Sequence, residues 1–146
     1  RIRIGYPDLA DEKKVLDRPQ SLHPADELAP VLTLQEVLDL QDRVEKVRLD
    51  DSLMEYLLAI VSETRRSELI AMGVSTRGAM ALHKAAKSLA LVRDREYCLP
   101  DDIKDLAPMV LAHRVTLHAG QGTRRHRSEE AEQVIRDIVE SVPVPL

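Results

Sequence analysis

The sequence contains no phenylalanine and no tryptophan, and only three tyrosines among its 146 residues. A hydrophobic core must therefore be built from leucine, valine, isoleucine, alanine and methionine, which favours closely packed helices over an aromatic-rich sheet. Hydrophobic residues make up 44% of the chain and charged residues 32%. This balance and length are typical of one soluble globular domain that is large enough to bury a core.

Cysteine and long apolar runs are also scarce. Cys98 is the single cysteine, which excludes an internal disulfide and fits a reducing compartment, so we expect a cytoplasmic protein. We interpret Cys98 as a buried packing residue. No apolar run approaches the roughly 20 residues that cross a bilayer, and no signal-peptide pattern is visible. We therefore expect no membrane contact.

A surplus of basic residues is missing. The net charge of −4 and the pI near 5.7 argue against general nucleic-acid binding. The segment Arg124–Arg127 (Arg-Arg-His-Arg), just before Ser128, is a basic cluster with two interpretations: a phosphate or RNA contact, or a solvated loop that leads into a helix. The second is favoured because no aromatic residues interleave to stack bases.

Recognisable catalytic motifs are absent as well. The chain has neither the phosphate-binding G-x-x-x-x-G-K-[ST] loop nor the G-x-S-x-G nucleophile elbow. His83, His113 and His118 have no cysteine or carboxylate at the spacing of a zinc site, so we interpret them as structural and predict no metal site. The acidic pairs Asp50-Asp51 and Asp101-Asp102 are interpreted as helix caps.

What the sequence does contain is helical periodicity, which predicts an all-α fold. Helix starts are predicted at Asp8, Thr33, Asp50 or Asp51, Ser75, Pro100 and Ser128. The segment 19–32, with three prolines, is predicted as loop or short turns, and Pro108 is expected to break or kink its helix. The predicted buried stripe of the helix that starts at Asp50 or Asp51 is Leu53, Leu57, Ile60, Val61 and Thr64. Apolar residues recur at helical spacing at Ala79, Leu82, Ala86, Leu89 and Val92, and the last, amphipathic helix carries Val134, Ile135, Ile138 and Val139.

The first residues predict something different. Arg1–Ile4 alternate polar and apolar side chains and stop at Gly5 and Pro7, the pattern of a short strand and its exit. Four residues cannot make a sheet, so the partners of this strand are expected in a preceding domain. We therefore predict that residues 1–7 end one domain and that residues 8–146 form a second, helical one.

The most informative stretch is Gly73–Gly78 (Gly-Val-Ser-Thr-Arg-Gly). Glycine permits a sharp turn, Ser75 can cap a helix, and Arg77 then lies in the first helical turn. A cation is mildly disfavoured at the positive end of a helix, so Arg77 indicates an anion nearby, and phosphate suits its forked donors. The alternative is an ordinary surface arginine.

A set of short motifs, in this order, carries a family resemblance: Ile4–Pro7, Thr64-Arg65, Gly73–Gly78, Ala85–Lys87, Pro100–Ile103, Leu111–Arg114 and the Val-Pro-Val-Pro ending. Together they closely resemble the C-terminal part of MoxR-family AAA+ ATPases. The resemblance implies that residues 1–7 are the last strand and hinge of an α/β ATPase core and that residues 8–146 are the helical lid. It also implies that Gly73–Gly78 is the sensor 2 motif, with Arg77 reaching the γ-phosphate, and that Tyr6 and Pro7 lie near the adenine.

The same resemblance implies a function. ATP and Mg²⁺ would bind the full-length protein, whose Walker motifs belong to the upstream AAA+ core, so this chain alone is expected neither to hydrolyse ATP nor to hold a cofactor. The parent would form a homo-oligomeric ring and remodel or mature a partner protein, and family members often work alongside partners with von Willebrand A domains. Leu99 departs from the family, which usually offers a capping Ser or Thr there. Two rival hypotheses remain: a helical protein-interaction module without a nucleotide role, and an enzyme with an unrecognised site.

Overall fold

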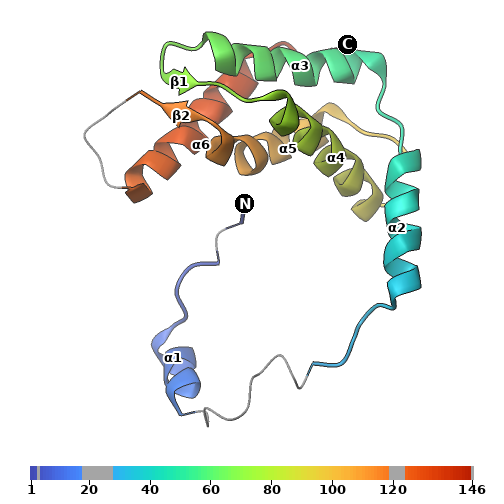
Figure 1. Cartoon of the computed structure of the whole chain (residues 1–146), viewed down its shortest axis with the longest axis vertical. Helices are drawn as coiled ribbons and strands as arrows, with labels where there is room; N and C mark the ends of the chain where they lie inside the picture. Colours follow the sequence, from blue (N-terminus) through green and yellow to red (C-terminus); the bar gives the residue numbers. More distant parts are fainter. Residues whose placement is uncertain (3, 18–27, 119–123, 146) are drawn as a thin grey trace. The chain divides into compact units, whose positions relative to one another are not determined.

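The computed structural model describes residues 1–2, 4–17, 28–118 and 124–145, with the backbone alone for 124–127. Two compact units divide the chain, one formed by Ile2–Asp39 and the other by Arg1 with Leu40–Leu146. Six α-helices and one small two-stranded sheet are present within the described residues (Figure 1), which confirms the all-α prediction. In that part of the chain, no helix is both long and apolar enough to span a bilayer.

The smaller unit holds α1 (Leu9–Leu16) and the first turns of α2 (Leu34–Lys46). Both predicted helix starts are confirmed. The Asp8 carboxylate accepts the Asp11 amide at 2.8 Å. At α2, Thr33 Oγ1 accepts the Glu36 amide at 3.2 Å, and Glu36 Oε2 accepts the Thr33 amide at 2.7 Å, which completes a capping box.

The strand expected at the first residues does not form within the described chain, where Arg1, Ile2 and Ile4 have no regular secondary structure. A strand needs a hydrogen-bonded neighbour, and that neighbour was expected outside this sequence. The domain boundary after residue 7 therefore stays a prediction. Most of the predicted 19–32 loop lies outside the described residues.

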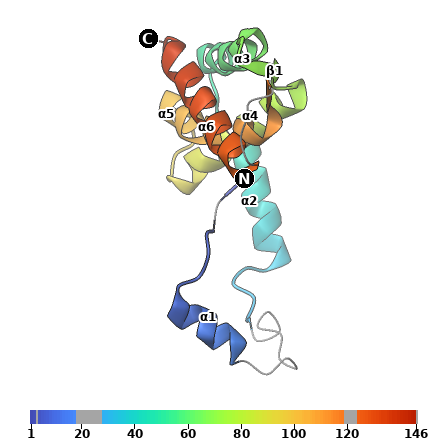
Figure 2. The same ribbon diagram turned by 90° about the vertical axis from the view of Figure 1, so that its left-hand side faces the viewer.

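The larger unit is built around α3 (Asp51–Arg66), α4 (Thr76–Val92), α5 (Pro100–Leu111) and α6 (Arg124–Ser141). Helix α4 packs against α3 and α5, and α6 packs against α5 and α3 (Figure 2). The predicted stripes of α3 and α6 are buried, and so are Ala79, Leu82 and Ala86 of α4. Val92, at the last position of α4, is 82% exposed although it shares the helical spacing of these residues.

Two short strands were not predicted. Strand β1 (Ile70–Met72) pairs antiparallel with β2 (Thr116–Leu117), which follows the 3₁₀ helix η2 (Ala112–Arg114). Segments of two or three residues show no readable alternation, which is why the sequence pattern missed them. Their pairing brings the chain that leaves α3 beside the chain that leaves α5.

One predicted helix start is wrong, and one possible helix break does not occur. Helix α5 continues through Pro108 to Leu111, because Pro108 is buried and α5 is held between α4 and α6. Such tertiary packing offsets the one backbone hydrogen bond that proline removes. Helix α6 begins at Arg124 rather than Ser128, so the basic cluster forms its first turn and is no loop. The side chains of 124–127 lie outside the described part.

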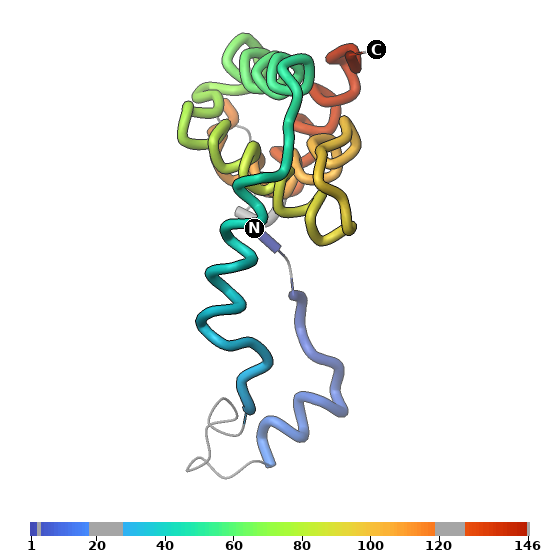
Figure 3. The backbone as a smooth tube through the Cα atoms, turned by 90° about the vertical axis from the view of Figure 1, so that its right-hand side faces the viewer, coloured from blue at the N-terminus to red at the C-terminus, as the bar shows by residue number. Residues whose placement is uncertain are grey.

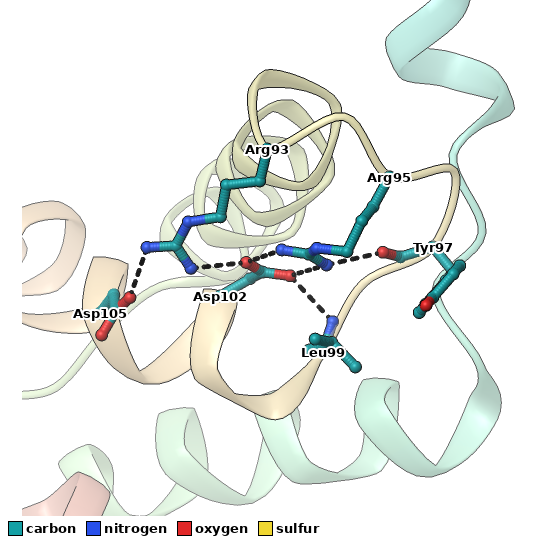
Figure 4. Close-up of polar contacts among 6 residues, drawn as sticks. All are labelled: Arg93, Arg95, Tyr97, Leu99, Asp102 and Asp105. Carbon is teal, nitrogen blue, oxygen red and sulfur yellow. Dashed lines mark hydrogen bonds and ion pairs between the residues drawn. The ribbon is translucent and has the colours of Figure 1, made fainter.

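The loop between α4 and α5 is anchored by a fully buried carboxylate (Figure 4). Asp102 accepts two hydrogen bonds from Arg95, at 2.6 and 2.8 Å, and one from Arg93 at 3.0 Å. It also accepts the Leu99 amide at 2.8 Å. Burial alone would raise the pKa of Asp102, but the hydrogen bonds from Arg95 and the Leu99 amide and the two arginine charges outweigh it, and the pKa lies below its ordinary value.

This geometry corrects the interpretation of the acidic pairs as simple caps. Asp102 does satisfy the Leu99 amide at the start of α5, and the Asp102 amide, which a Ser or Thr hydroxyl at position 99 would bond, donates to the Leu99 carbonyl at 3.1 Å instead. The same carboxylate also joins two arginines, which capping alone did not predict. Asp50 stands at the N-cap of α3, but its side chain makes no capping hydrogen bond.

The link between α2 and α3 is extended at Arg48, which forms a parallel bridge with Tyr97 of the α4–α5 loop. The Arg48 amide donates to the Glu96 carbonyl at 2.8 Å, and the Cys98 amide donates to the Arg48 carbonyl at 2.9 Å. Figure 3 follows this backbone from α2 into α3. Cys98 is buried, as predicted, and burial raises the pKa of its thiol. The link is thus bonded to the α4–α5 loop.

Candidate functional site

The Arg77 turn, defined as Gly73–Gly78, leads from β1 into α4. Ser75 is the N-cap, as predicted, with extended backbone (φ −74°, ψ 165°) and an Oγ that accepts the Gly78 amide at 3.4 Å. Arg77 lies in the first turn of this 17-residue helix and is exposed. Within the described residues, no hydrogen bond or ion pair reaches its guanidinium, which leaves all its donors free for a ligand.

The Arg77 turn is fixed to the end of α3 through the backbone of Val74. Thr64 Oγ1, itself donating to the Val61 carbonyl at 2.6 Å, accepts the Val74 amide at 3.0 Å. Arg65 Nε donates to the Val74 carbonyl at 2.8 Å. Both polar groups of Val74, a residue only 1% exposed, are therefore bonded to α3. These contacts hold the residues immediately before Arg77 in one position.

The two glycines of the turn permit this close approach. A Cβ at Gly73 would lie 2.7 Å from both Arg65 Cα and the Thr64 carbonyl oxygen, so a side chain there would clash with the backbone of α3. A Cβ at Gly78 would lie 2.5 Å from Val74 Cγ1. Glycine is required at these two positions by packing, since neither has a positive φ.

A second arginine packs on the first turn of α4. A Cβ at Gly78 would lie 3.3 Å from Arg114 Cδ, so the stem of Arg114 runs directly over this glycine. The Arg114 guanidinium donates to the Val110 carbonyl and contacts His113 Nε2. Burial and then the Arg114 charge lower the pKa of His113, which keeps its imidazole neutral. The start of α4 thus has two arginines close to it, Arg77 and Arg114.

Sequence reasoning missed the parts that hold Arg77. Thr64 was predicted only as a buried residue and, with Arg65, as one of the motifs of the family resemblance. In the structure Arg65 bonds Val74, whereas its neighbour Arg66 is exposed and forms an ion pair with Glu63 at 3.4 Å. Gly73, two residues before the Ser75 cap, is the feature of the sequence that could have predicted this close approach to α3.

The other residues considered in the sequence lie outside the Arg77 turn. Tyr6 and Pro7 belong to the smaller unit, where Tyr6 is 95% exposed, and their place near an adenine stays a prediction. His83 lies on α4, where burial and the Lys87 charge lower its pKa, and His118 follows β2. Across the described residues, no three His, Cys, Asp or Glu side chains gather closely enough to hold a metal ion.

Comparison with known protein families places the turn in context. The family model described as the AAA lid domain matches residues 62–138, which include the end of α3, the Arg77 turn and most of α6. The chain belongs to the AAA lid domain family. The matched range includes Thr64 and Arg65, their bonding partner Val74, and the segment around Arg114.

Similarity to individual proteins identifies the type of AAA lid more closely. The lid is 40% identical to the Bacillus subtilis protein YeaC over all of this chain and 45% of that protein. It is 31% identical to the chaperone MoxR1 of Mycobacterium tuberculosis, over 80% of this chain and 33% of that protein. A solved structure from Cytophaga hutchinsonii, described as a putative ATPase, superposes with a TM-score of 0.75 at 27% identity, over 98% of this chain and 45% of that one. The prediction of a MoxR-type AAA+ lid is confirmed, and the chain spans less than half the length of these relatives.

Proposed function

We propose that Arg77 binds the γ-phosphate of an ATP molecule held by an AAA+ core and that the lid closes over this nucleotide. The observation that carries the proposal is the free guanidinium of Arg77 at the start of α4, presented by a turn that is bonded on both sides to α3. A planar fork of donors suits a phosphate, and a helix N-terminus favours a negative charge nearby. The residues present therefore fit the phosphate end of a nucleotide.

The chemistry of this contact would be electrostatic. Negative charge redistributes over the phosphoryl group as it is transferred, and a positioned guanidinium stabilises that charge. The Walker motifs and the Mg²⁺ ligands would come from the core, since this chain holds no G-x-x-x-x-G-K-[ST] motif and its described residues form no metal cluster. Tyr6 and Pro7, in the hinge segment, would contact the adenine.

In the whole protein, we propose that the lid couples hydrolysis to remodelling of a partner protein within a homo-oligomeric ring in the cytoplasm. The similarity to the chaperone MoxR1 supports a remodelling role for proteins with this lid. A protein with a von Willebrand A domain would work alongside such a ring as a partner. This part of the proposal concerns the full-length protein, of which the chain is the lid.

The decisive experiment is steady-state ATPase kinetics of the full-length protein with Arg77→Ala and Arg77→Lys. Loss of a guanidinium aimed at developing charge slows turnover by roughly a hundredfold or more, by analogy with the loss of one transition-state donor. Lysine restores only part of the rate, because a point charge replaces a planar fork. Arg66→Ala is the matched control, as Arg66 is an exposed arginine whose ion pair with Glu63 lies elsewhere on α3.

Thermal melts of the lids separate this role from a structural one. Arg77 is exposed and makes no side-chain hydrogen bond or ion pair within the described residues, so Arg77→Ala should change the stability of the lid by less than about 0.5 kcal/mol. Normal turnover in Arg77→Ala would remove Arg77 from the mechanism and favour the rival hypothesis of an interaction module. If the Arg77→Ala lid fails to fold, the role of the Arg77 turn would be the structural one of starting α4.

A calorimetric titration of the chain with ATP and Mg²⁺ tests whether the lid binds the nucleotide without the core. A charged hydrogen bond contributes on the order of 1.5–3 kcal/mol, which alone corresponds to millimolar binding or weaker. The chain without the core is therefore expected to bind ATP at most weakly. A micromolar dissociation constant would show that the lid has a nucleotide site of its own.

A further inference from the structure

A groove of about 430 Å³ lies where the last turn of α2, the extended link and the α4–α5 loop meet. We call it the basic groove, after its cations Arg43, Lys46 and Arg48. Val47 and Leu91 give it an apolar floor, and Glu96 and Tyr97 complete its lining. All these residues belong to the larger unit and lie apart in sequence from the Arg77 turn.

The cations of the basic groove are uncompensated. Arg43, Lys46 and Arg48 are exposed, and within the described residues no ion pair or side-chain hydrogen bond reaches them. The nearby Arg93 and Arg95 differ, because Asp102 and Asp105 together balance their two charges. With Glu96 counted, the groove carries a net charge of +2 (three cations and one carboxylate) in a chain whose net charge is −4. This contrast of sign favours an anionic partner.

The walls of the groove are held in place by bonds that the rest of the fold supplies. Arg48 exchanges backbone hydrogen bonds with Glu96 and Cys98, at 2.8 and 2.9 Å. Arg95 donates to the Tyr97 carbonyl at 2.9 Å while it is bonded to Asp102 (Figure 4). Lys87 Nζ donates to the Glu45 carbonyl at 2.6 Å and so ties the end of α2 to α4. A groove with fixed walls loses little conformational entropy on binding.

We propose that the basic groove binds an acidic peptide segment of a partner protein. Its cations would pair with carboxylates, and the half-exposed ring of Tyr97 (51% exposed) with Leu91 and Val47 would receive an apolar side chain between them. A carboxylate in the wall, Glu96, can accept a peptide N–H but repels a continuous phosphate backbone. A mixed acidic and apolar peptide therefore fits better than a nucleic acid. The proposal does not depend on a nucleotide role for Arg77.

Fluorescence anisotropy of the chain tests this with a short labelled peptide built of glutamate and leucine. The charge-reversed variant Arg43→Glu/Arg48→Glu should bind the peptide at least about tenfold more weakly at low salt, where exposed charges are least screened. Tyr97→Ala, which keeps every cation, should weaken binding severalfold through the lost ring contact. The matched control is Arg66→Glu/Arg136→Glu, which makes the same charge change at exposed arginines that do not line the groove and should alter affinity by less than about twofold.

Three results would overturn the proposal. The control variant could lose as much affinity as the groove variant, which would mean that only overall charge matters. A single-stranded oligonucleotide could bind as tightly as the peptide and weaken equally in the groove variant. The unaltered chain could fail to bind the peptide at low salt. Thermal melts check that each variant is folded, and Arg43→Gln/Arg48→Gln replaces the charge reversal if that variant unfolds.

Discussion

Arg65 donates its Nε hydrogen to the carbonyl oxygen of Val74, 2.8 Å away and nine residues further along the chain. The preceding residue, Thr64, accepts the amide of the same Val74 at 3.0 Å. The end of α3 therefore holds Val74, the residue immediately before Ser75, the N-cap of α4. Because Arg77 follows this cap within one helical turn, the direction in which its guanidinium points depends on these two bonds.

The first prediction concerns Arg65. In the full-length protein, Arg65→Met should lower kcat more than it raises the KM for ATP, because Arg77 is then less well placed as charge develops. This expectation rests on the proposed role of Arg77. Arg66→Met, at the adjacent and exposed position, is the control and should leave both constants unchanged. Equal kinetics for the two variants would mean that the Val74 contact serves folding alone.

The second prediction concerns the space between Val74 and Gly78. Gly78→Ala should destabilise the lid by about 1–3 kcal/mol, because its methyl would lie 2.5 Å from Val74 Cγ1 in a buried site. Val74→Ala/Gly78→Ala should recover much of this loss, since the smaller side chain leaves room for the new methyl. Denaturant melts of the single and double variants measure this coupling. At Gly73 the obstacle is the backbone of α3, so Val74→Ala should not rescue Gly73→Ala.

The third prediction compares two helix caps. Ser75→Ala should destabilise the lid by about 0.5–1 kcal/mol, in the lower part of the usual range because the Ser75 Oγ to Gly78 amide distance is 3.4 Å. Asp50→Ala removes an N-cap side chain that makes no capping bond and should cost less. Urea melts of the two variants give the comparison. Coincident curves for Ser75→Ala and the unaltered chain would show that the long hydrogen bond contributes nothing.

The fourth prediction concerns Asp102. Asp102→Asn should destabilise the lid by about 3 kcal/mol, at the low end of the range for a broken buried ion pair because Arg93 is 43% exposed. Asp105→Asn breaks only a surface pair with Arg93 and should cost less than about 1 kcal/mol. The stabilities of both variants can be measured in one urea series at neutral pH. Equal losses would mean that the burial of Asp102 does not strengthen its pairing.

The pH dependence of the same variant follows from the sign of the pKa shift. The pKa of Asp102 is lower in the folded chain than its ordinary value of about 3.9, so its ionised form stabilises the fold. This stabilisation is complete above the ordinary pKa and is lost as the pH falls through the lower, folded value. The difference between the unaltered chain and Asp102→Asn should therefore stay constant from neutral pH to about pH 5 and shrink only below about pH 4.

The fifth prediction concerns Tyr56, which is 3% exposed on α3. Its hydroxyl is buried and has no hydrogen-bond partner within the described residues, and burial followed by the charge of Asp101 raises its pKa. Tyr56→Phe removes this unpaired group and keeps the ring, so stability should stay equal or rise by up to about 1 kcal/mol. A loss of more than about 1 kcal/mol in thermal melts would show that the hydroxyl has a partner.

The helices of this chain were readable from local signals. Their starts at Asp8, Thr33, Ser75 and Pro100 depend on capping chemistry within three or four residues, and the buried faces of α3 and α6 follow the helical period. The same local rules failed at Pro108, where α5 continues because neighbouring helices hold it. They also failed at Arg124, where α6 begins without the serine that was expected to start it. Helix starts are local, whereas continuity through a weak point depends on packing.

For the candidate site, local signals were enough to predict the turn, its cap and the position of Arg77 in the first turn of a helix, because glycine, serine and an apolar repeat act over a few residues. What holds that turn depends on tertiary contacts. The bonds from Thr64 and Arg65 to Val74 join the end of one helix to the turn before the next, and the stem of Arg114 reaches Gly78 from a segment much further along the chain, so no local pattern encodes them. The same is true of Asp102, since its burial and its two arginines depend on how α4 and α5 pack and reverse the effect that burial alone would have on its pKa.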